Sequence, residues 1–427
     1  MWRRWRRPGS SQPALTSAPS SRATGTAPTP GPASEPRYVV LLALLLGSQP
    51  VATDLYLPAL PTIAAQLGNP ALTLTGLTLF FGFAQLVLGP LSDRLGRRPV
   101  LLAGCAGYAL TSFVGAWVDT LAALIVCRCL QGVAMAAMVV CARASIRDLY
   151  APLEGARVFS RGLTGLGFLA LSSPLVGALV VSRVSWHAAF AVLGVFGLAT
   201  FAWVWFFYDE SRPAPNPGAK PVTTLEATRI VLASARFRAW TAVLCTSYGT
   251  LFCFLLASGF VYIQVFGFST LACGMVLAGN SVCYIGGTYA CRRLLLRMSP
   301  DRAVTLSAGF SVGGGLFMLV AALARGTPEA WAMIVGQYLF AIGHGVNQPC
   351  AQVGAVAEFP ELAGRAAALS GCLMMVVAFG VGQAMAPFLG SSAWPLIVAN
   401  TLGGSLVALS AWGLVRHSHR DLAAQAV

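Results

Sequence analysis

The sequence is poor in charge. Only 10% of its 427 residues are Asp, Glu, Lys or Arg, whereas soluble globular domains carry about 25%. A soluble chain with so few charges could not cover its surface, and 56% of the residues are hydrophobic. The composition therefore excludes an ordinary soluble protein and predicts one that is surrounded by a lipid bilayer.

Acidic residues and lysine are scarcer still. The chain has 14 acidic and 28 basic residues, a formal charge of +14, and Lys220 is its single lysine. An excess of this size can indicate nucleic-acid binding. Here the arginines lie in short clusters between apolar runs, which is the pattern that sets membrane topology. We therefore expect no nucleic-acid partner.

Groups of metal-binding and catalytic residues are also missing. The 11 cysteines show no paired C-x-x-C spacing and fall in or near apolar runs, which favours a packing role. A membrane enzyme would need paired carboxylates, a metal cluster or an activated nucleophile at membrane depth. One Asp, one Arg and a lone His do not supply these. We expect no enzymatic activity, no metal and no cofactor, and keep an integral membrane enzyme as a remote alternative.

Apolar stretches of about 20 residues recur from Tyr38 onward, each long enough to cross ~30 Å of hydrocarbon. They predict an all-α integral membrane protein with twelve transmembrane helices. The expected spans are 38–62, 72–92, 98–118, 121–145, 158–182, 187–208, 238–265, 271–296, 302–323, 331–356, 364–388 and 394–416.

The basic residues of the connecting loops fall on one side. When the loops are numbered alternately, the side opposite the N-terminal tail holds only Arg183 and Arg325. The positive-inside rule then places both termini in the cytoplasm and requires an even number of spans.

The pattern also divides the chain. We expect a disordered basic cytoplasmic tail over 1–37, because this Pro- and Ser-rich segment cannot bury enough apolar surface to fold. No short apolar region with a cleavage site follows it directly, which disfavours a signal peptide. A first half over 38–208 and a second over 237–416 repeat at an offset of about 200 residues. A cytoplasmic linker over 209–236 joins them, and a cytoplasmic tail follows over 417–427. Two pseudo-symmetric six-helix halves are typical of a transporter with its substrate site between them.

Two charged residues lie deep in the apolar spans, Asp54 in the first and Arg128 in the fourth. Each costs at least ~2.5–3.5 kcal/mol to insert, so both are functional candidates. Burial favours a neutral carboxyl group, which would let Asp54 take up and release a proton. The alternatives are a static buried ion pair or, for Asp54, a position close enough to the outer surface to be solvated.

The connection between the second and third spans reads GPLSDRLGRRPVL over residues 89–101. It resembles the signature loop of the major facilitator superfamily, G-x-L-[SA]-D-R-x-G-R-R-x-x-L. The corresponding positions are Gly89, Asp93, Arg94, Gly96, Arg97 and Arg98. This resemblance implies the major facilitator fold, and with it a gate at the cytoplasmic side.

Further motifs agree with that family. Arg128, Gln131 and Gly132 are similar to its proton-coupling motif in the fourth helix. The resemblance implies that Asp93 and Arg94 interact with Arg147 and Asp148 at the inner end of that helix.

Residues 162–177 are similar to the fifth-helix motif associated with exporters, at Gly162, Pro174 and Gly177. They depart from it at Ser173 and Ala178, where glycine is usual, which weakens the inference of export.

The run TDLYLPALP over residues 53–61 resembles the first-helix signature of Bcr/CflA-type drug:proton antiporters, which include bicyclomycin and chloramphenicol exporters. In the second half, His344 and Gln348 lie one helical turn apart and are candidate substrate contacts together with Tyr56. Hydrogen bonding between helices is the alternative role for the polar pair.

These resemblances imply a proton-coupled multidrug or antibiotic exporter that works by alternating access, with Asp54, Arg128 and Gln131 coupling protons to substrate. The expected partners are the lipid bilayer, protons and a small hydrophobic drug-like molecule. The expected location is the bacterial inner (plasma) membrane, as a monomer. An importer of a small nutrient or osmolyte with the same fold is the main alternative.

Overall fold

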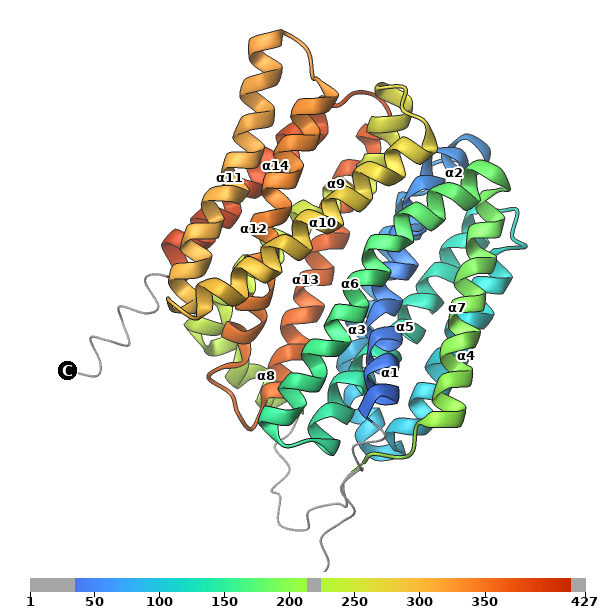
Figure 1. Ribbon diagram of the computed structural model, residues 1–427, viewed down its shortest axis with the longest axis vertical. Helices are drawn as coiled ribbons and strands as arrows, with labels where there is room; N and C mark the ends of the chain where they lie inside the picture. The colour runs from blue at the N-terminus through green and yellow to red at the C-terminus, as the bar shows by residue number, and fades with distance from the viewer. Residues whose placement is uncertain (1–34, 213–223, 416–427) are drawn as a thin grey trace, which may run out of the picture.

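The computed structural model describes residues 35–212 and 224–415, and these are folded into helices (Figure 1). Of the expected basic tail over 1–37, residues 1–34 lie outside the described residues, and residues 35–37 form the start of the first helix instead of being disordered. The expected C-terminal tail over 417–427, residue 416 and the part of the linker over 213–223 also lie outside the described residues.

The first half contains an interrupted first helix and five further long helices. The first helix consists of α1 (Glu35–Asp54), a 3₁₀ turn over Leu57–Ala59 and α2 (Leu60–Leu67). The others are α3 (Ala71–Leu95), α4 (Arg97–Gly115), α5 (Leu121–Leu149), α6 (Pro152–Arg183) and α7 (Trp186–Phe207).

The second half repeats this order. Its helices are α9 (Ala235–Gly259), which a π-helical turn extends to Val265, then α10 (Thr270–Leu295), α11 (Pro300–Arg325), α12 (Ala330–Val356), α13 (Ala363–Met385) and α14 (Trp394–Leu409). The part of the expected linker that the structure describes contains a helix of its own, α8 (Thr224–Ala233). Arg365 at the start of α13 donates to Thr228 on α8, which ties the linker helix to the second half.

Ten helices of the described chain are long and apolar enough to cross a membrane. The expected spans over 98–118 and 331–356 form α4 and α12, which are long helices of the same bundle but are not among these ten. The fold class is confirmed as all-helical and membrane-embedded, and the count of twelve spans stays a prediction.

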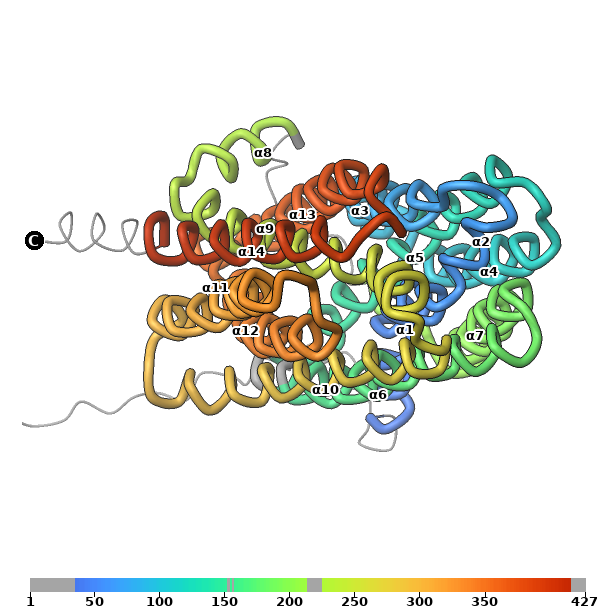
Figure 2. The backbone as a smooth tube through the Cα atoms, turned by 90° about the horizontal axis from the view of Figure 1, so that it is seen from above, coloured from blue at the N-terminus to red at the C-terminus, as the bar shows by residue number. Residues whose placement is uncertain are grey.

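The helix pairs of the first half recur in the second. The helix α5 packs on α3 and α4, and α12 packs in the same way on α10 and α11. The two halves then meet through α3 against α13 and α6 against α10, which exchange with each other under the same correspondence. Figure 2 shows both pairs side by side along the junction, with α1 and α9 between them. This pseudo-twofold arrangement places the junction at the centre of the molecule.

Small residues allow these helices to approach closely. A Cβ at Gly132 on α5 would collide with the Leu77 carbonyl of α3, which is backbone and cannot move aside alone. Close packing of this kind is a principal attraction between helices in lipid, because the hydrophobic effect does not drive them together there.

We predict that Gly132→Ala lowers the thermal unfolding temperature of the purified protein by several degrees, since overpacking costs ~1–3 kcal/mol. Gly286→Ala is the matched control, because a Cβ added there on α10 would meet no neighbour within 4 Å among the described residues. It should leave stability unchanged or raise it, since alanine stabilises a helix by up to ~1 kcal/mol relative to glycine. Equal melting temperatures for Gly132→Ala and the wild type would contradict this packing.

Candidate functional site

The first helix breaks at Asp54, which is the last residue of α1. In a continuous helix the amide of Tyr56 would donate to the Ala52 carbonyl four residues back. It donates to Thr53 instead, at 3.2 Å, and the chain turns into the 3₁₀ segment that contains Pro58. The break leaves the Ala52 carbonyl without its helical donor in the interior of the bundle.

Arg128 on α5 supplies the missing donor. Its side chain is 0% exposed, and its Nη2 donates to the Ala52 carbonyl at 2.9 Å. Its Nε donates to the Thr73 carbonyl at 3.3 Å and its Nη1 to Gln131 Oε1 at 2.6 Å. The planar guanidinium group thus joins three helices, and its cation faces a helix C-terminus, where positive charge is favoured.

The surroundings of Arg128 are polar and aromatic. Its guanidinium carbon lies 4.5 Å from the ring centroid of Tyr56. The Tyr56 hydroxyl bonds with Thr73 Oγ1 at 2.7 Å, and Gln131 Nε2 donates to Ser112 Oγ at 2.7 Å. Tyr56 is fully buried beneath Arg128 and faces no open space in this conformation.

Asp54 is half-buried and is not paired with Arg128. Its Oδ1 accepts a hydrogen bond from Thr53 Oγ1 at 2.8 Å. Within the described residues no basic side chain forms a salt bridge with it. The static buried ion pair is therefore not what this conformation contains, and the carboxyl group is free to change its protonation without breaking one.

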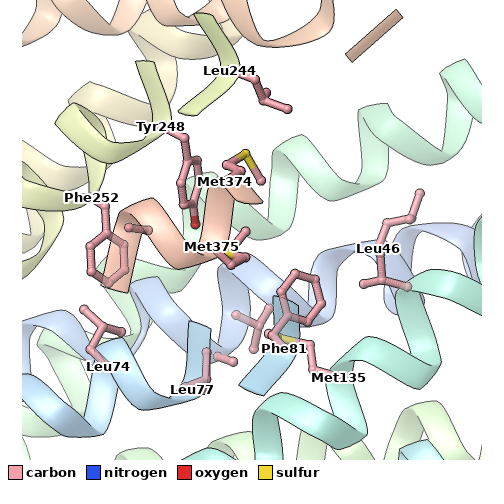
Figure 3. Close-up of a cluster of buried hydrophobic side chains, with 14 of the residues drawn as sticks. Leu46, Leu74, Leu77, Phe81, Met135, Leu244, Tyr248, Phe252, Met374 and Met375 are labelled. Atoms are coloured by element: carbon pink, nitrogen blue, oxygen red, sulfur yellow. The ribbon is translucent and has the colours of Figure 1, made fainter. Parts of the chain in front are cut away.

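An apolar cluster fills the junction between the halves near this break (Figure 3). Figure 3 shows side chains from the first half facing others from the second, among them Leu46, Phe81, Met135, Leu244, Tyr248, Met374 and Met375. Gln49 Nε2 on α1 lies 3.3 Å from the Tyr248 hydroxyl on α9, which links the two halves one turn before Asp54. Methionine side chains are flexible and polarizable, so such a cluster can adapt to apolar molecules of different shapes.

The polar pair on α12 is engaged with neighbouring helices. His344 is buried, and its Nδ1 lies 2.8 Å from Ser247 Oγ on α9. The Tyr284 hydroxyl of α10 donates to Gln348 Oε1 at 2.8 Å. Both side chains thus form bonds between helices in this conformation, while a role in substrate contact stays a prediction.

Arg97 organises the loop between α3 and α4. Its guanidinium group pairs with Asp93 at 2.5 Å and with Asp148 at the end of α5 at 2.9 Å. It also donates to Ser92 Oγ at 2.6 Å. Among the described residues, the expected ion pairs of Arg94 and Arg147 are thus not formed, because Arg97 is the arginine that points between the two carboxylates.

Glu210 is a functional candidate that sequence reasoning missed. Its carboxylate accepts from the amides of Arg97 at 2.8 Å and Arg98 at 3.1 Å, the first residues of α4. Gly96 permits this approach, because its φ is 104° and a Cβ there would lie 2.5 Å from Glu210 Oε2. The only available signal was an acid just after the sixth apolar run, which does not reveal its partner.

The backbone amides that bond to Glu210 lower the pKa of its carboxyl group. Partial burial would raise the pKa of this carboxyl group, but the donated amides of Arg97, Arg212 and Arg98 outweigh it and hold the pKa below its ordinary value of 4.5. A carboxylate bonded to backbone amides at a helix N-terminus is stabilised in its charged form.

The fifth-helix motif packs the break in place. A Cβ at Gly177 on α6 would collide with the Leu55 carbonyl, directly after Asp54. A Cβ at Gly162 would lie 2.7 Å from Leu42 on α1. On its other side α6 meets α10, where Gly274 lies against Ala178 and the Pro174 carbonyl. Close packing therefore survives the replacement by Ala178, because the partner helix supplies the glycine.

Comparison with known proteins decides the family. Residues 42–383 match the profile of the Major Facilitator Superfamily. The chain belongs to this superfamily. It is 29% identical to a Pseudomonas aeruginosa protein named "Chloramphenicol resistance protein", over 86% of this chain and 88% of that protein. It is 26% identical to the "Bicyclomycin resistance protein homolog" of Haemophilus influenzae, over 87% and 93%.

Three further similarities, one to a sequence relative and two to solved structures, agree with this assignment. The protein is 27% identical to "Multidrug resistance protein D" of Escherichia coli over 87% of the chain and 94% of the relative. Its fold resembles an inward-facing bacterial homolog of the lysosomal transporter Spinster, with a TM-score of 0.68, 14% identity and 91% and 98% of the two chains covered. The human organic anion transporter MFSD10 gives 0.65 and 20%, over 88% and 99%. At these identities the two structures show the fold alone.

For this facilitator we predict that Arg128→Lys lowers the thermal unfolding temperature markedly. A lysine ammonium group cannot reach the carbonyls of Ala52 and Thr73 and the Gln131 amide together, and each buried acceptor left unpaired costs ~1–3 kcal/mol. Arg293→Lys is the control, because Arg293 is exposed and bonds with Tyr289 of its own helix. An Arg128→Lys protein that melts with the wild type would show that the three bonds do not support the break.

A second prediction from this site concerns how the stability of the protein depends on pH. Because the folded-state pKa of Glu210 is lowered, its stabilising effect is present above the ordinary value of 4.5 and is lost as the pH falls through the lower folded value. Glu210→Gln should therefore melt below the wild type at pH 7, and the gap should close below about pH 4.5. Asp209→Asn, at the exposed preceding residue, should show no such gap. A difference in melting temperature that stays constant with pH would show that the charge of the Glu210 carboxylate does not stabilise the start of α4.

Proposed function

We propose that this protein exports small, largely apolar drug-like molecules in exchange for protons, with Asp54 as the proton-carrying group. The observation that carries the proposal is a carboxyl group that no described basic side chain pairs with, placed at a helix break beside an adaptable apolar cluster on the junction between the halves. The three curated relatives above carry the names of antibiotic or multidrug resistance proteins.

The contacts between the halves suggest which side is closed. At the end of the bundle that holds α2, Asn69 Nδ2 donates to the Ala386 carbonyl at 3.0 Å. Gln383 Nε2 donates to Thr75 Oγ1 at 2.6 Å. A Cβ at Gly259 would lie 3.0 Å from the Leu57 carbonyl. The two hydrogen bonds and this close packing join the two halves on the outer side of Asp54, as expected of a carrier that faces the cytoplasm.

Exchange then follows from a change in charge at the break. A proton on Asp54 neutralises the carboxylate and removes the cost of holding a charge beside apolar side chains. Loss of the proton restores that cost and favours a conformation that hydrates the group. One charge that moves through 100 mV is worth ~2.3 kcal/mol, which suffices to bias the rocking of two halves.

The proposal includes the direction of transport and the orientation of the protein in the membrane. The packing of Gly177 and Gly162 against α1 supports export, since it reproduces the fifth-helix motif associated with exporters. Import of a small nutrient remains the alternative within the same fold. The basic side chains at the loops of the first half gather at one end, where Arg212 donates to the Arg94 carbonyl and Arg97 bonds with Asp148. We place this end and both termini in the cytoplasm of a bacterial inner-membrane protein that acts as a monomer.

We predict that Asp54→Asn abolishes proton-driven efflux while expression is retained, because the amide cannot exchange a proton. The measurement is accumulation of chloramphenicol and of a lipophilic dye in efflux-deficient cells, with and without an uncoupler. Wild-type cells should accumulate several-fold less, and both the uncoupler and the substitution should remove that difference. Asp119→Asn, at an exposed outer carboxylate, should behave as the wild type. Full activity of Asp54→Asn would exclude Asp54 from the mechanism.

A further inference from the structure

A stripe on α5 runs from the apolar cluster toward the cytoplasmic end of the junction. Met135, Val139, Arg143 and Arg147 follow at intervals of four residues and so lie on one face of the helix. Met135 belongs to the cluster in Figure 3 and Val139 is buried. At the other end, the Arg147 guanidinium lies 3.4 Å from the place that a Cβ would occupy at Gly364 on α13. Arg143, between them, therefore faces the opposite half.

The two arginines of this stripe have no counter-ion within the described chain. Both side chains are exposed, and among the described residues neither takes part in an ion pair. The adjacent carboxylate of Asp148 is held by Arg97. Like charges four residues apart on a helix repel each other. Two such guanidinium groups at the edge of an apolar cluster form a place where an anionic group is favoured and a cation is not.

The location of Asp54 relative to Arg143 strengthens this preference for an anionic group. Asp54 ends α1, beyond the cluster and toward the outer side, whereas Arg143 lies a whole turn closer to the cytoplasm than Val139. A molecule that enters from the cytoplasm meets the arginine before it meets the carboxyl group. Guanidinium groups bind carboxylates through two parallel hydrogen bonds, which gives orientation as well as attraction.

We propose that Arg143 determines the charge of the substrate, and that the site takes amphipathic organic anions, with a carboxylate at Arg143 and the apolar body in the methionine-rich cluster, in preference to lipophilic cations. This inference rests on the proposed function and narrows its substrate class. It also has an electrical consequence. Export of one monovalent anion against entry of one proton moves two positive charges inward, so an inside-negative potential drives such substrates twice as strongly as neutral ones.

The test uses two dyes with the same xanthene body, fluorescein as the anion and rhodamine 123 as the cation. Binding to the purified full-length protein is measured by fluorescence anisotropy, and efflux is measured in cells. The wild type should bind fluorescein at least about tenfold more tightly than rhodamine 123, as a ~1.4 kcal/mol charge preference implies. Arg143→Glu should invert that ratio, and Arg143→Lys should retain it, since the positive charge is kept.

Arg293→Glu is the matched control, because it makes the same change of charge at an exposed arginine in the last turn of α10, which bonds with Tyr289 of its own helix and lies outside the stripe on α5. It should leave the ratio of affinities unchanged. A ratio that is the same in the wild type, Arg143→Glu and Arg143→Lys would overturn the inference even if both dyes are exported. Conversely, binding that depends on Arg143 without export of either dye would support the inference and refute the proposed function. Thermal unfolding of each variant without dye separates a loss of binding from a loss of fold.

Discussion

The arrangement of the site depends on how the bundle accommodates a broken helix. A helix that stops inside a membrane leaves backbone carbonyls without donors, and lipid offers none. Arg128 meets this need at Ala52, and it reaches Thr73 and Gln131 in the same plane. The cation is stabilised by a helix C-terminus and by the Tyr56 ring rather than by a carboxylate. Asp54 can therefore end the helix as an acid that Arg128 does not hold in its charged form, as the proposed exchange of protons requires.

Close packing by small residues connects the broken first helix to the neighbouring helices of both halves. The glycines of α6 hold the break from one side, and α10 holds α6 from the other through Gly274. The pseudo-twofold relation repeats the contact between α6 and α10 as the contact between α3 and α13. The break is thus in direct packing contact with a helix of one of the two seams between the halves. At the end of the bundle that holds the loop over residues 89–101, Arg97 and Glu210 tie the start of α4 to the ends of α5 and α7.

Much of the fold could be predicted, and less of the site. Spans over the long apolar runs, the loop motif of residues 89–101 and the family were all accessible, because each depends on local composition or on a contiguous motif. His344 and Gln348 on α12 and Arg128 on α5 were also recognisable as unusual residues in apolar spans. Their partners were not. Arg97 rather than Arg94 pairs with Asp148, and Glu210 closes the loop from more than 100 residues away. These identities depend on side-chain direction at a helix terminus, which spacing does not determine.

The sequence by itself determined that this chain lies in a bilayer, where its apolar helices begin and end to within a few residues, and to which superfamily it belongs. These properties follow from hydropathy summed over short windows and from residues that are neighbours in the chain. Only the tertiary structure decided that Asp54 and Arg128 do not pair, and that Arg128 donates to the Ala52 carbonyl instead. The same holds for the position of Arg143 at the junction, with no counter-ion in the described chain. The physical reason is that hydrogen bonds and ion pairs act over about 3 Å, so they depend on which helix faces meet and at what rotation, and helices far apart in sequence set both.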